Sequence, residues 1–356
     1  MHDNVLNQLQ QYKAAITEQL EKVIKDKQAG FAIVNEWGSD TLDRLLEFSK
    51  NGKMIRGALL LCGTEMFGRK ITAEHLKAAT ALELIQSAIL IHDDIIDQDA
   101  LRRGKPAMHT QFQTLGVERK LDNPAQFGTS LALCVGDVGF FLAFELLNSL
   151  TASRETKTRI TQLVLQEIQM VGLAEMQDVF FSATSKQIDE SEILQLYRYK
   201  TGRYTFSLPL ACGALFAGQL APVITKVVEL GENLGILFQL KDDELSLFGK
   251  TSTTGKPVGT DVLRNNKTLY RYYLYKCATV VEIKRLTTIF GNHTSLQSDI
   301  RYVVELLRRY QVQKLVQAKI RITELQVHAL MKQLPTNLKL KALLISLMNY
   351  NSKRTK

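Results

Sequence analysis

The chain has 356 residues, of which 45% are hydrophobic and 23% are charged, and its formal net charge is +9. A chain of this length can bury a large core, as one domain or as two smaller ones. The positive charge suggests a nucleic-acid partner. However, the basic residues are dispersed, and no zinc-finger, RNP-type or basic-zipper motif accompanies them. We therefore expect no nucleic-acid partner, since a preference for anionic ligands and a solvated surface account better for the charge.

The cysteines and the N-terminus predict a cytoplasmic protein. The cysteines are scattered in apolar surroundings without metal-ligand spacing, which is typical of reduced, buried thiols. They are Cys62, Cys134, Cys212 and Cys277. The N-terminal residues form neither a basic region nor an apolar core, so no signal peptide is expected.

Proline spacing predicts the fold class. The chain has only six prolines, with none in residues 1–105 or 258–334, and it shows no hairpin signal and no short repeat. Long proline-free spans rich in Leu, Ala, Gln, Glu and Lys favour helix. We therefore predict an all-α fold, and a single domain over residues 1–356 because no linker interrupts the chain.

One uncharged stretch, residues 205–225, is long enough to cross a membrane. It contains Pro209, Pro222, Gln219 and several small residues. We therefore predict a helix in the protein core and no membrane span.

The first part of the chain predicts three helices. Residues 3–28 carry an amphipathic stripe, residues 40–49 form a second helix, and the segment from Asn51 to Gly57 opens a third. Lys53 and Arg56 are three residues apart, so both cations project from one face near a helix N-terminus, where backbone N–H groups also attract anions. The pair is either an ordinary surface pair or a phosphate site.

The next predicted helix, residues 73–99, ends in a cluster of carboxylates. Asp93 and Asp97 are four residues apart and share a face, with Asp94 to one side and Gln86 two turns earlier on the same face. Two carboxylates one turn apart suit Mg²⁺, which keeps several waters and shares its other positions with phosphate oxygens. A solvated acidic helix end is the alternative.

Two arginines, Arg102 and Arg103, follow the carboxylates at once, in a segment that ends the helix before Pro106. They either neutralise the aspartates or bind a diphosphate, which arginine does in a bidentate manner.

Four more helices are predicted in the middle of the chain. They span residues 127–149, 157–182, 193–217 and 220–248. The third contains Lys200 and Thr201, and Pro209 is expected to kink it.

The helix over residues 220–248 is a second apolar helix that ends in paired aspartates. Gln239, Asp242 or Asp243, and Ser246 fall on one face of it. Two acidic helices facing each other would hold a cluster of Mg²⁺ ions with a diphosphate inside it.

A loop rich in Gly, Thr and Lys, residues 249–261, follows directly and is well placed to act as a lid. Residues 267–350 predict further amphipathic helices, with a basic tail after them.

These motifs, in this order, resemble those of the trans-isoprenyl diphosphate synthases, the head-to-tail prenyltransferases. The resemblance extends along nearly the whole chain, and the ordered set is specific although each motif alone is weak. The motifs are Gly-Lys-x-x-Arg at 52–56, DDxxD at 93–97, Arg-Arg-Gly at 102–104, Gly136-Asp137, Lys200-Thr201, Phe238-Gln239, Asp242-Asp243, Gly255-Lys256, and Asp261 through Lys267.

The resemblance implies a large antiparallel helical bundle around a deep central cavity, usually a homodimer, with isopentenyl diphosphate and an allylic diphosphate as substrates. It implies that Asp93, Asp97 and Asp242 are ligands of a cluster of three Mg²⁺ ions, with Asp94 and Asp243 as supporting acids. It also implies contacts to the allylic diphosphate from Arg102, Lys200 and Lys256, and contacts to isopentenyl diphosphate from Lys53, Arg56, Gln86 and Arg103. Lys267 completes the expected substrate-binding set.

The chemistry that the resemblance implies needs no side-chain nucleophile. Mg²⁺, Arg and Lys stabilise the diphosphate that leaves when the allylic C–O bond ionises. The carbocation must not meet water, so the cavity has to be apolar and closed. In the family, the Thr201 hydroxyl, the Gln239 amide oxygen and the Lys200 carbonyl are the dipoles that stabilise the cation. Attack by isopentenyl diphosphate and proton loss complete the step.

Three positions depart from the family pattern. Met54 stands where an Arg is common, which removes one contact to isopentenyl diphosphate. Gln86 stands where many bacterial members have His, although Gln also occurs there. Ser246 replaces the last Asp of the second motif. Activity is expected to survive because Asp242 is retained.

Product length is expected to depend on residues below the metals. Ala88 and Ile89 precede Asp93 by five and four residues, roughly one turn. In the family, bulky aromatics at these positions stop growth at farnesyl, which Ala88 would not. Phe140, Phe141 and Phe144 either cap the chain deeper down or are ordinary core residues. We expect geranylgeranyl diphosphate, then a longer polyprenyl product, then farnesyl diphosphate.

Two other functions remain open from the sequence. A non-catalytic or regulatory subunit of a heteromeric synthase would explain Ser246 and Met54, but not the retained acids and cations. A terpene cyclase would share the first acidic motif, but it would lack the second motif and the Lys53, Arg56 and Arg103 set.

Overall fold

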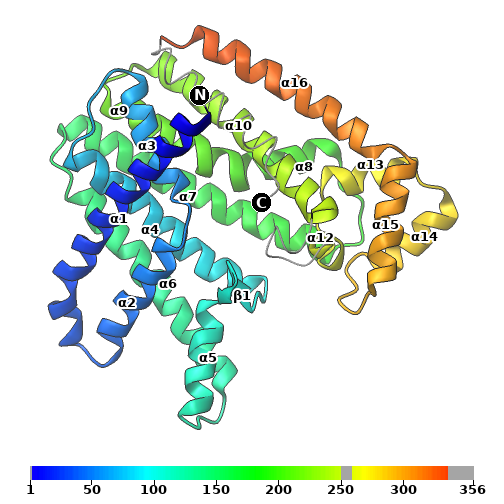
Figure 1. The fold of residues 1–356 in the computed structure, drawn as a ribbon, viewed down its shortest axis with the longest axis horizontal. Coiled ribbons are helices and arrows are strands. Elements are labelled where there is room, and N and C mark those ends of the chain that lie inside the picture. The colour runs from blue at the N-terminus through cyan, green and yellow to red at the C-terminus, as the bar shows by residue number, and fades with distance from the viewer. Residues whose placement is uncertain (1, 250–258, 336–356) are drawn as a thin grey trace. The chain divides into compact units, whose positions relative to one another are not determined.

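The computed structural model describes residues 2–249 and 259–335, which are almost entirely helical (Figure 1). The predicted all-α fold is confirmed. The chain divides into two compact units: Met1–Thr161 with Cys212–Gly218, and Gln162–Ala211 with Gln219–Lys356. The single domain over residues 1–356 stays a prediction.

The first unit is built around helix α4. This helix packs against α1, α2, α3, α5 and α6, so it lies at the centre of the unit. The elements of the unit are α1 (His2–Ala32), α2 (Trp37–Lys50), α3 (Ile55–Met66), α4 (Ala73–Ile96), β1 (Leu101–Arg102), β2 (Lys105–Pro106), α5 (Met108–Glu118) and α6 (Pro124–Asn148). Helix α5 and the strands were not expected from the sequence.

Local signals set both ends of α4. At its start, Thr72 and His75 form a reciprocal capping box. At its end, the Gln98 amide donates to the Ile95 carbonyl (3.2 Å) and the Asp99 amide to the Asp94 carbonyl (2.8 Å). This is the Schellman pattern, which requires a left-handed residue just after the helix. Gln98, with φ of 55°, occupies that position without being a glycine, so the acidic helix end is closed by a turn of some backbone strain.

The chain then reverses in a two-residue hairpin. Strands β1 and β2 pair antiparallel, with Arg102 opposite Lys105. Arg103 and Gly104 between them have φ of 56° and 76°. Two consecutive positive φ values are what a tight type I′ hairpin turn demands. Gly104 adopts this left-handed conformation without strain, whereas Arg103 adopts it because the turn requires it.

The second unit is built around helix α10. This helix packs against η1, α12, α13 and α16. The elements wholly inside the unit are α8 (Glu190–Leu196), the π-helix η1 (Tyr197–Ser207), α10 (Ala221–Phe248), α12 (Thr260–Leu263), α13 (Leu269–Cys277), α14 (Val280–Ile289), α15 (Gln297–Arg309) and α16 (Val312–Gln333). Helices α7 (Arg154–Ala183) and α9 (Leu208–Phe216) contribute residues to both units.

The helix predicted over residues 193–217 is not continuous. It consists of α8, the π-helix η1 and then α9, so the irregular part precedes Pro209 instead of being a kink at it. Proline has no amide hydrogen and its ring clashes with the preceding turn, so the turn before it cannot keep the regular α-helical bonding. The π-helical segment begins at Tyr197, twelve residues before Pro209, so the proline alone does not account for it; such segments are frequent at functional sites.

Glycines bring η1 and α10 into direct backbone contact. A Cβ on Gly235 of α10 would lie 2.1 Å from the Cα of Gly202 in η1, and a Cβ on Gly231 would lie 2.4 Å from the backbone of Ser207. No side chain fits at these two glycines unless the helices separate. The close approach therefore fixes which residues of η1 and α10 can meet.

Of the four free cysteines, Cys62 and Cys212 are buried as predicted. The prediction is wrong for Cys134 and Cys277, which are exposed because they lie on the outward face of α6 and at the end of α13.

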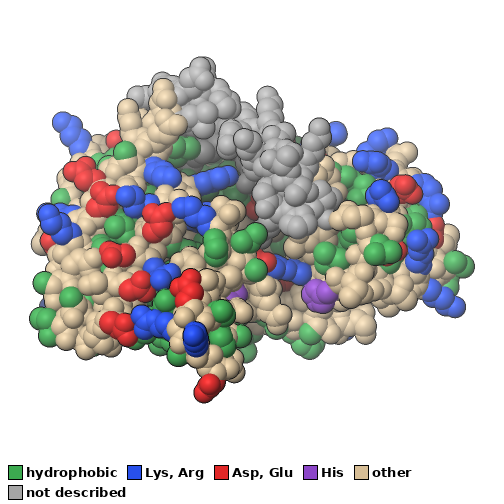
Figure 2. Space-filling model, turned by 60° about the horizontal axis from the view of Figure 1, so that its bottom comes forward, with side chains coloured by type: hydrophobic (Ala, Val, Ile, Leu, Met, Phe, Trp, Pro, Cys, Tyr) green, Lys and Arg blue, Asp and Glu red, His purple; other side chains and the backbone are tan. Residues whose placement is uncertain are grey.

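Among the described helices, α6 alone is long and apolar enough to cross a membrane by length and composition. A core helix meets the same criterion, and α6 packs against α4 and α5. In Figure 2, basic and acidic side chains are interspersed on the left of the view, whereas basic side chains predominate on the right.

Candidate active site

The first part of the site is one face of α4. Gln86, Ile89, Asp93 and Asp97 are spaced three, four and four residues apart, so they follow one another along the same side of the helix. All four are only half-buried within the described residues. This face of α4 is therefore not fully covered by the other helices of the unit. The two carboxylates lie at the C-terminal end of α4.

Asp94 points the other way and is fully buried. It accepts a hydrogen bond from Nε of Arg102 (2.6 Å), and the same guanidinium lies 3.1 Å from Asp93 and 3.8 Å from Asp99. Burial raises the pKa of Asp94 to about 6, and the Arg102 guanidinium opposes that rise. Asp94 thus positions Arg102, and Arg102 relieves the repulsion among the acids.

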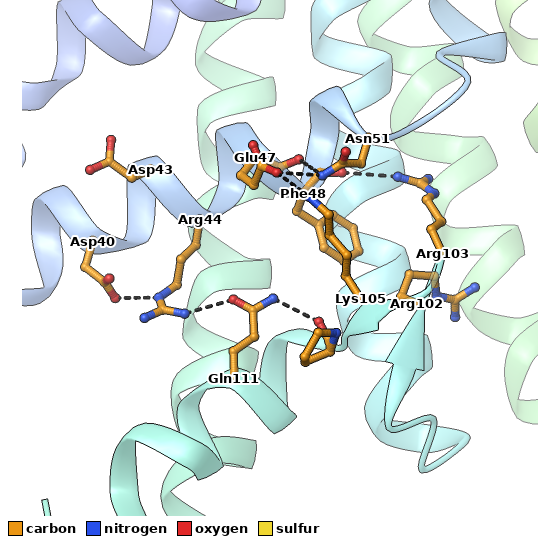
Figure 3. Close-up of a pocket in the computed structure, with 11 residues that line it drawn as sticks. Asp40, Asp43, Arg44, Glu47, Phe48, Asn51, Arg102, Arg103, Lys105 and Gln111 are labelled. Carbon is orange, nitrogen blue, oxygen red and sulfur yellow. Dashed lines mark hydrogen bonds and ion pairs between the residues drawn. The ribbon is translucent and has the colours of Figure 1, made fainter. Parts of the chain in front are cut away.

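The hairpin that carries the two arginines is held on α2 and α5 around a cavity of about 320 Å³ (Figure 3). Arg103 reaches towards the end of α2, where it donates to the Phe48 carbonyl (3.1 Å), whereas Arg102 points away from that helix. Lys105 pairs with Glu47 (2.7 Å). Gly52 leaves room for Arg103, since a Cβ there would lie 3.2 Å from its guanidinium. The hairpin therefore presents its two cations in different directions.

The loop before α3 holds the third group of predicted residues. Lys53 is exposed and Arg56 half-buried, whereas Met54 is only 1% exposed and adopts a left-handed conformation (φ 50°). Its sulfur lies 3.5 Å from the Thr17 hydroxyl. The side chain at position 54 therefore packs into the core, which explains why an apolar residue is tolerated in place of the family's arginine.

A buried acid that the sequence did not single out supports this loop. Glu83 of α4 accepts the Gly57 amide at the start of α3 (2.7 Å). Burial raises its pKa, while the Gly57 bond and the charges of Arg56 and Arg103 act in the opposite direction. Glu83 thus links the two predicted phosphate-binding arginines to α4. The sequence feature that could have indicated Glu83 was a single charged residue between Leu82 and Leu84 in an apolar helix.

The second part of the site lies on α10 and η1. The Thr201 hydroxyl donates to Oε1 of Gln239 (2.9 Å), and Nε2 of Gln239 donates to Oδ1 of Asp243 (2.9 Å). The other oxygen of Asp243 accepts from the Tyr197 hydroxyl. Asp243 is buried, and burial raises its pKa well above the usual value. Asp242 next to it is half-buried.

The two acidic motifs therefore share one design. In each, the first aspartate is half-buried and the second is buried among protein partners. Ser246, one turn after Asp242, has a buried hydroxyl with no hydrogen-bond partner within the described residues.

The predicted lysines differ in their surroundings. Lys200 lies 2.8 Å from Glu175 and 2.6 Å from Asp178, two acids on α7 to which the sequence gave no role. Lys267 is 3% exposed and donates to the Thr184 carbonyl (2.8 Å), and burial lowers its pKa to about 7. Lys256 lies outside the described residues.

Four of the five residues predicted to bear on product length lie in different environments. Ala88 is fully buried, and a Cβ on Gly139 of α6 would lie 3.3 Å from its own Cβ. Ile89 lies on the Asp93 face and is half-buried. Phe140 contacts the His92 ring, with centroids 5.8 Å apart, whereas Phe141 is 70% exposed.

The donor chemistry suits a hard divalent cation. Asp93, Asp97 and Asp242 offer only carboxylate oxygens, and neither cysteine nor histidine lies beside them in the sequence except His92. Within residues 2–249 and 259–335, no group of three or more potential ligands is arranged to hold a metal alone. Such a set fits Mg²⁺, which keeps waters and takes further oxygens from a phosphorylated substrate.

Comparison with known proteins identifies the family. Residues 36–307 match the family model of the polyprenyl synthetases. A geranylgeranyl diphosphate synthase of Saccharolobus solfataricus is 29% identical over 268 residues, 75% of each chain. A short chain isoprenyl diphosphate synthase of Methanocaldococcus jannaschii is 30% identical over 274 residues, 76% of this chain and 78% of that one.

Among solved structures, a geranylgeranyl pyrophosphate synthase from Corynebacterium glutamicum, complexed with isoprenyl diphosphate and magnesium, superposes with a TM-score of 0.91. It is 25% identical, and the match covers 97% of this chain and 99% of that one. The family match and the similar enzymes together define a trans-prenyltransferase. The chain belongs to the polyprenyl synthetase family.

Proposed function

We propose that this protein condenses isopentenyl diphosphate with an allylic diphosphate, head to tail, and releases inorganic diphosphate. The observation that carries the proposal is the division of labour on α4. Asp93 and Asp97 stay on the half-exposed face, while buried Asp94 holds Arg102 beside them. The carboxylates that would bind a cation thus lie next to the guanidinium that would bind a phosphate.

Asp93, Asp97 and Asp242 would hold Mg²⁺, three ions with substrate bound. When bound, the ions neutralise charge on the departing diphosphate and favour ionisation of the allylic C–O bond. Support comes from the oxygen-only donor set and from the magnesium in the similar C. glutamicum enzyme. Arg102, now paired with Asp93, would exchange part of that pairing for phosphate oxygens.

The cations would divide the two substrates between them. Arg102, Lys200 and Lys256 would bind the allylic diphosphate. Isopentenyl diphosphate would take the other set, which is Lys53, Arg56, Gln86 and Arg103. The buried Gln86 Oε1, which has no hydrogen-bond partner within the described residues, supports a role in receiving a ligand or an ordered water there.

The carbocation would be stabilised by the Thr201 hydroxyl and the Gln239 amide. Because Gln239 donates to Asp243, its oxygen is turned towards Thr201. The Thr201 oxygen keeps its lone pairs for another positive group. No protein nucleophile is required, since the double bond of isopentenyl diphosphate attacks the cation and a proton then leaves to the diphosphate.

Geranylgeranyl diphosphate is the product we propose. Ile89 one turn before Asp93 is smaller than an aromatic residue, and several relatives bear the name geranylgeranyl diphosphate synthase. Turnover of the purified protein alone with Mg²⁺, isopentenyl diphosphate and farnesyl diphosphate, followed by chromatography of the products, tests both reaction and length. Absence of turnover would favour a non-catalytic partner subunit.

We further propose a cytoplasmic homodimer. The outward face of α6 exposes Leu133 (41%) and Phe141 (70%), apolar side chains that a second copy would cover. The four free cysteines agree with a reducing compartment. Light scattering after gel filtration decides the oligomeric state, and a monomeric mass at micromolar concentration would refute the dimer.

A further inference from the structure

We propose that Tyr197 is a positioning residue that orients Gln239 and Thr201 for the prenyl transfer proposed above, through the buried carboxylate of Asp243. Tyr197 is the first residue of the π-helix η1, and its side chain is buried. It matches none of the motifs on which the family resemblance rests.

The tyrosine hydroxyl is engaged on both sides. It donates to one oxygen of Asp243 and accepts the amide of Leu269, the first residue of α13 (3.1 Å). A single oxygen thus joins η1, α10 and the start of α13. Residues 72 positions apart in the chain meet there.

The hydrogen bonds from Gln239 to Asp243 and from Thr201 to Gln239 fix how the Gln239 amide is turned. Both oxygens of Asp243 accept in the structure, one from the Tyr197 hydroxyl and the other from the NH₂ of Gln239 (2.9 Å). The Gln239 oxygen is then turned the other way, where it accepts from Thr201 (2.9 Å). Without a hydrogen bond from Tyr197, the carboxylate loses its fixed orientation and the Gln239 amide can rotate.

These hydrogen bonds matter because Thr201 lies in the π-helix η1. The backbone of η1 has the wider hydrogen bonding of a π-helix, and the side chain of Thr201 is joined to α10 by its bond to Gln239. The Gly202–Gly235 contact sets the separation of η1 and α10, and Tyr197 sets how the polar groups across that contact are turned. Both are needed if the dipoles of Thr201 and Gln239 are to face the reacting carbon.

The test compares Tyr197→Phe with Tyr270→Phe in the full-length protein. Tyr270 is also fully buried, but its hydroxyl has no hydrogen-bond partner within the described residues, so it controls for the loss of a buried hydroxyl. We expect Tyr197→Phe to lower kcat about tenfold or more, with KM for isopentenyl diphosphate changed less than about twofold. In an Asp243→Asn background the same change should cost much less, because the two residues act as a unit.

A second measurement is independent of turnover. Amide hydrogen exchange of the segment around Thr201 and of Leu269 should be faster in Tyr197→Phe than in wild type, and unchanged in Tyr270→Phe. Unchanged kcat in an active Tyr197→Phe protein, with only a lower Tm, would overturn the proposal and leave a structural role. If wild type itself proved inactive, the proposed function would fail, and the exchange rates would still decide the role of Tyr197.

Discussion

Arg102 and Asp94 form a buried ion pair across the turn that ends α4, with Nε of Arg102 2.6 Å from the carboxylate of Asp94. The Asp94 side chain is completely inaccessible and that of Arg102 is 15% exposed. Removing Asp94 takes away the fully buried partner of Arg102, but it leaves the guanidinium 3.1 Å from Asp93 and 3.8 Å from Asp99.

Asp94→Ala is therefore expected to lower the free energy of unfolding by about 1–3 kcal/mol, the scale of losing a buried hydrogen bond to a charged group. Denaturant unfolding followed by circular dichroism measures it. Asp137→Ala is the control: the side chain is 61% exposed and lies 3.7 Å from the ring nitrogen of His92, so the change should stay within about 0.5 kcal/mol. Equal effects of the two substitutions would contradict the pairing.

The acids of the two motifs should matter for rate more than for folding. Asp93→Ala and Asp242→Ala each remove a carboxylate proposed to hold Mg²⁺, so kcat should fall by at least about two orders of magnitude, the scale of losing a main electrostatic stabiliser. Steady-state turnover with isopentenyl and farnesyl diphosphates measures it. Asp122→Ala, at an exposed position, should keep wild-type turnover. Near-normal activity of either motif variant would remove that residue from the metal site.

Product length should respond to Ile89. Ile89 lies on the Asp93 face, so Ile89→Phe is expected to shorten the products, as judged by chromatography of the prenyl alcohols. Ala88 lies roughly 140° around the helix from Asp93. Since it packs against α6 near Gly139, Ala88→Phe is expected to cost about 1–3 kcal/mol of stability by overpacking. An unchanged product pattern in a well-folded Ile89→Phe protein would count against the role of Ile89.

The contact between η1 and α10 gives a prediction with a close control. Gly235→Ala puts a methyl group 2.1 Å from Gly202, so the helices must separate and the Thr201–Gln239 bond must break. We expect kcat to fall about 100-fold, the typical cost of misplacing reacting groups by an ångström.

Gly172→Ala on α7 adds the same methyl group where no atom lies within 4 Å. It should preserve activity and raise stability by about 0.5–1 kcal/mol, because alanine favours helix over glycine. The contact hypothesis does not survive if Gly235→Ala retains the wild-type kcat.

The buried Lys267 predicts a pH dependence of stability. Its folded-state pKa is about 7, lowered by burial from 10.5. Between these two values the unfolded chain binds one more proton than the folded one, so stability rises with pH through this window. Below pH 7 both states are protonated and the cost of burying the cation is fully present.

Compared with Lys267→Met, wild type should therefore gain Tm steadily from pH 7 to pH 10. Calorimetry of both proteins at each pH measures the difference. Lys276→Met removes an exposed lysine of α13 and reports what the same substitution does at the surface. Parallel Tm curves for wild type and Lys267→Met would show that Lys267 is not a buried cation.

The all-α class and the order of the motifs were predictable because they depend on local patterns. Periodic apolar residues, few prolines and acids at i and i+4 are properties of short segments, and α4 and α10 were found nearly to the residue. The hairpin was missed because its turn residues, Arg103 and Gly104, are not the usual Asn-Gly pair. The η1 segment was missed because its apolar residues follow the same helical spacing that an α-helix would show.

The buried partners of the site were the least predictable part. Asp94 and Asp243 look identical to Asp93 and Asp242 in sequence, and only packing decides which carboxylate turns inward. Glu83, Glu175 and Asp178 gain their roles from residues on other helices. The role proposed for Tyr197 depends on its contact with a residue 46 positions away in the chain, which no local sequence pattern predicts.

The two parts of the site differ in the sequence separation of the residues that form them. Asp94 and Arg102 are eight residues apart, joined by one left-handed turn, so a newly synthesised chain closes this loop at small entropic cost. The Tyr197 network waits for α13, 72 residues downstream of its tyrosine. We therefore expect the Asp94–Arg102 pair to form earlier in folding than the Tyr197 hydrogen bonds, because its loop is much shorter.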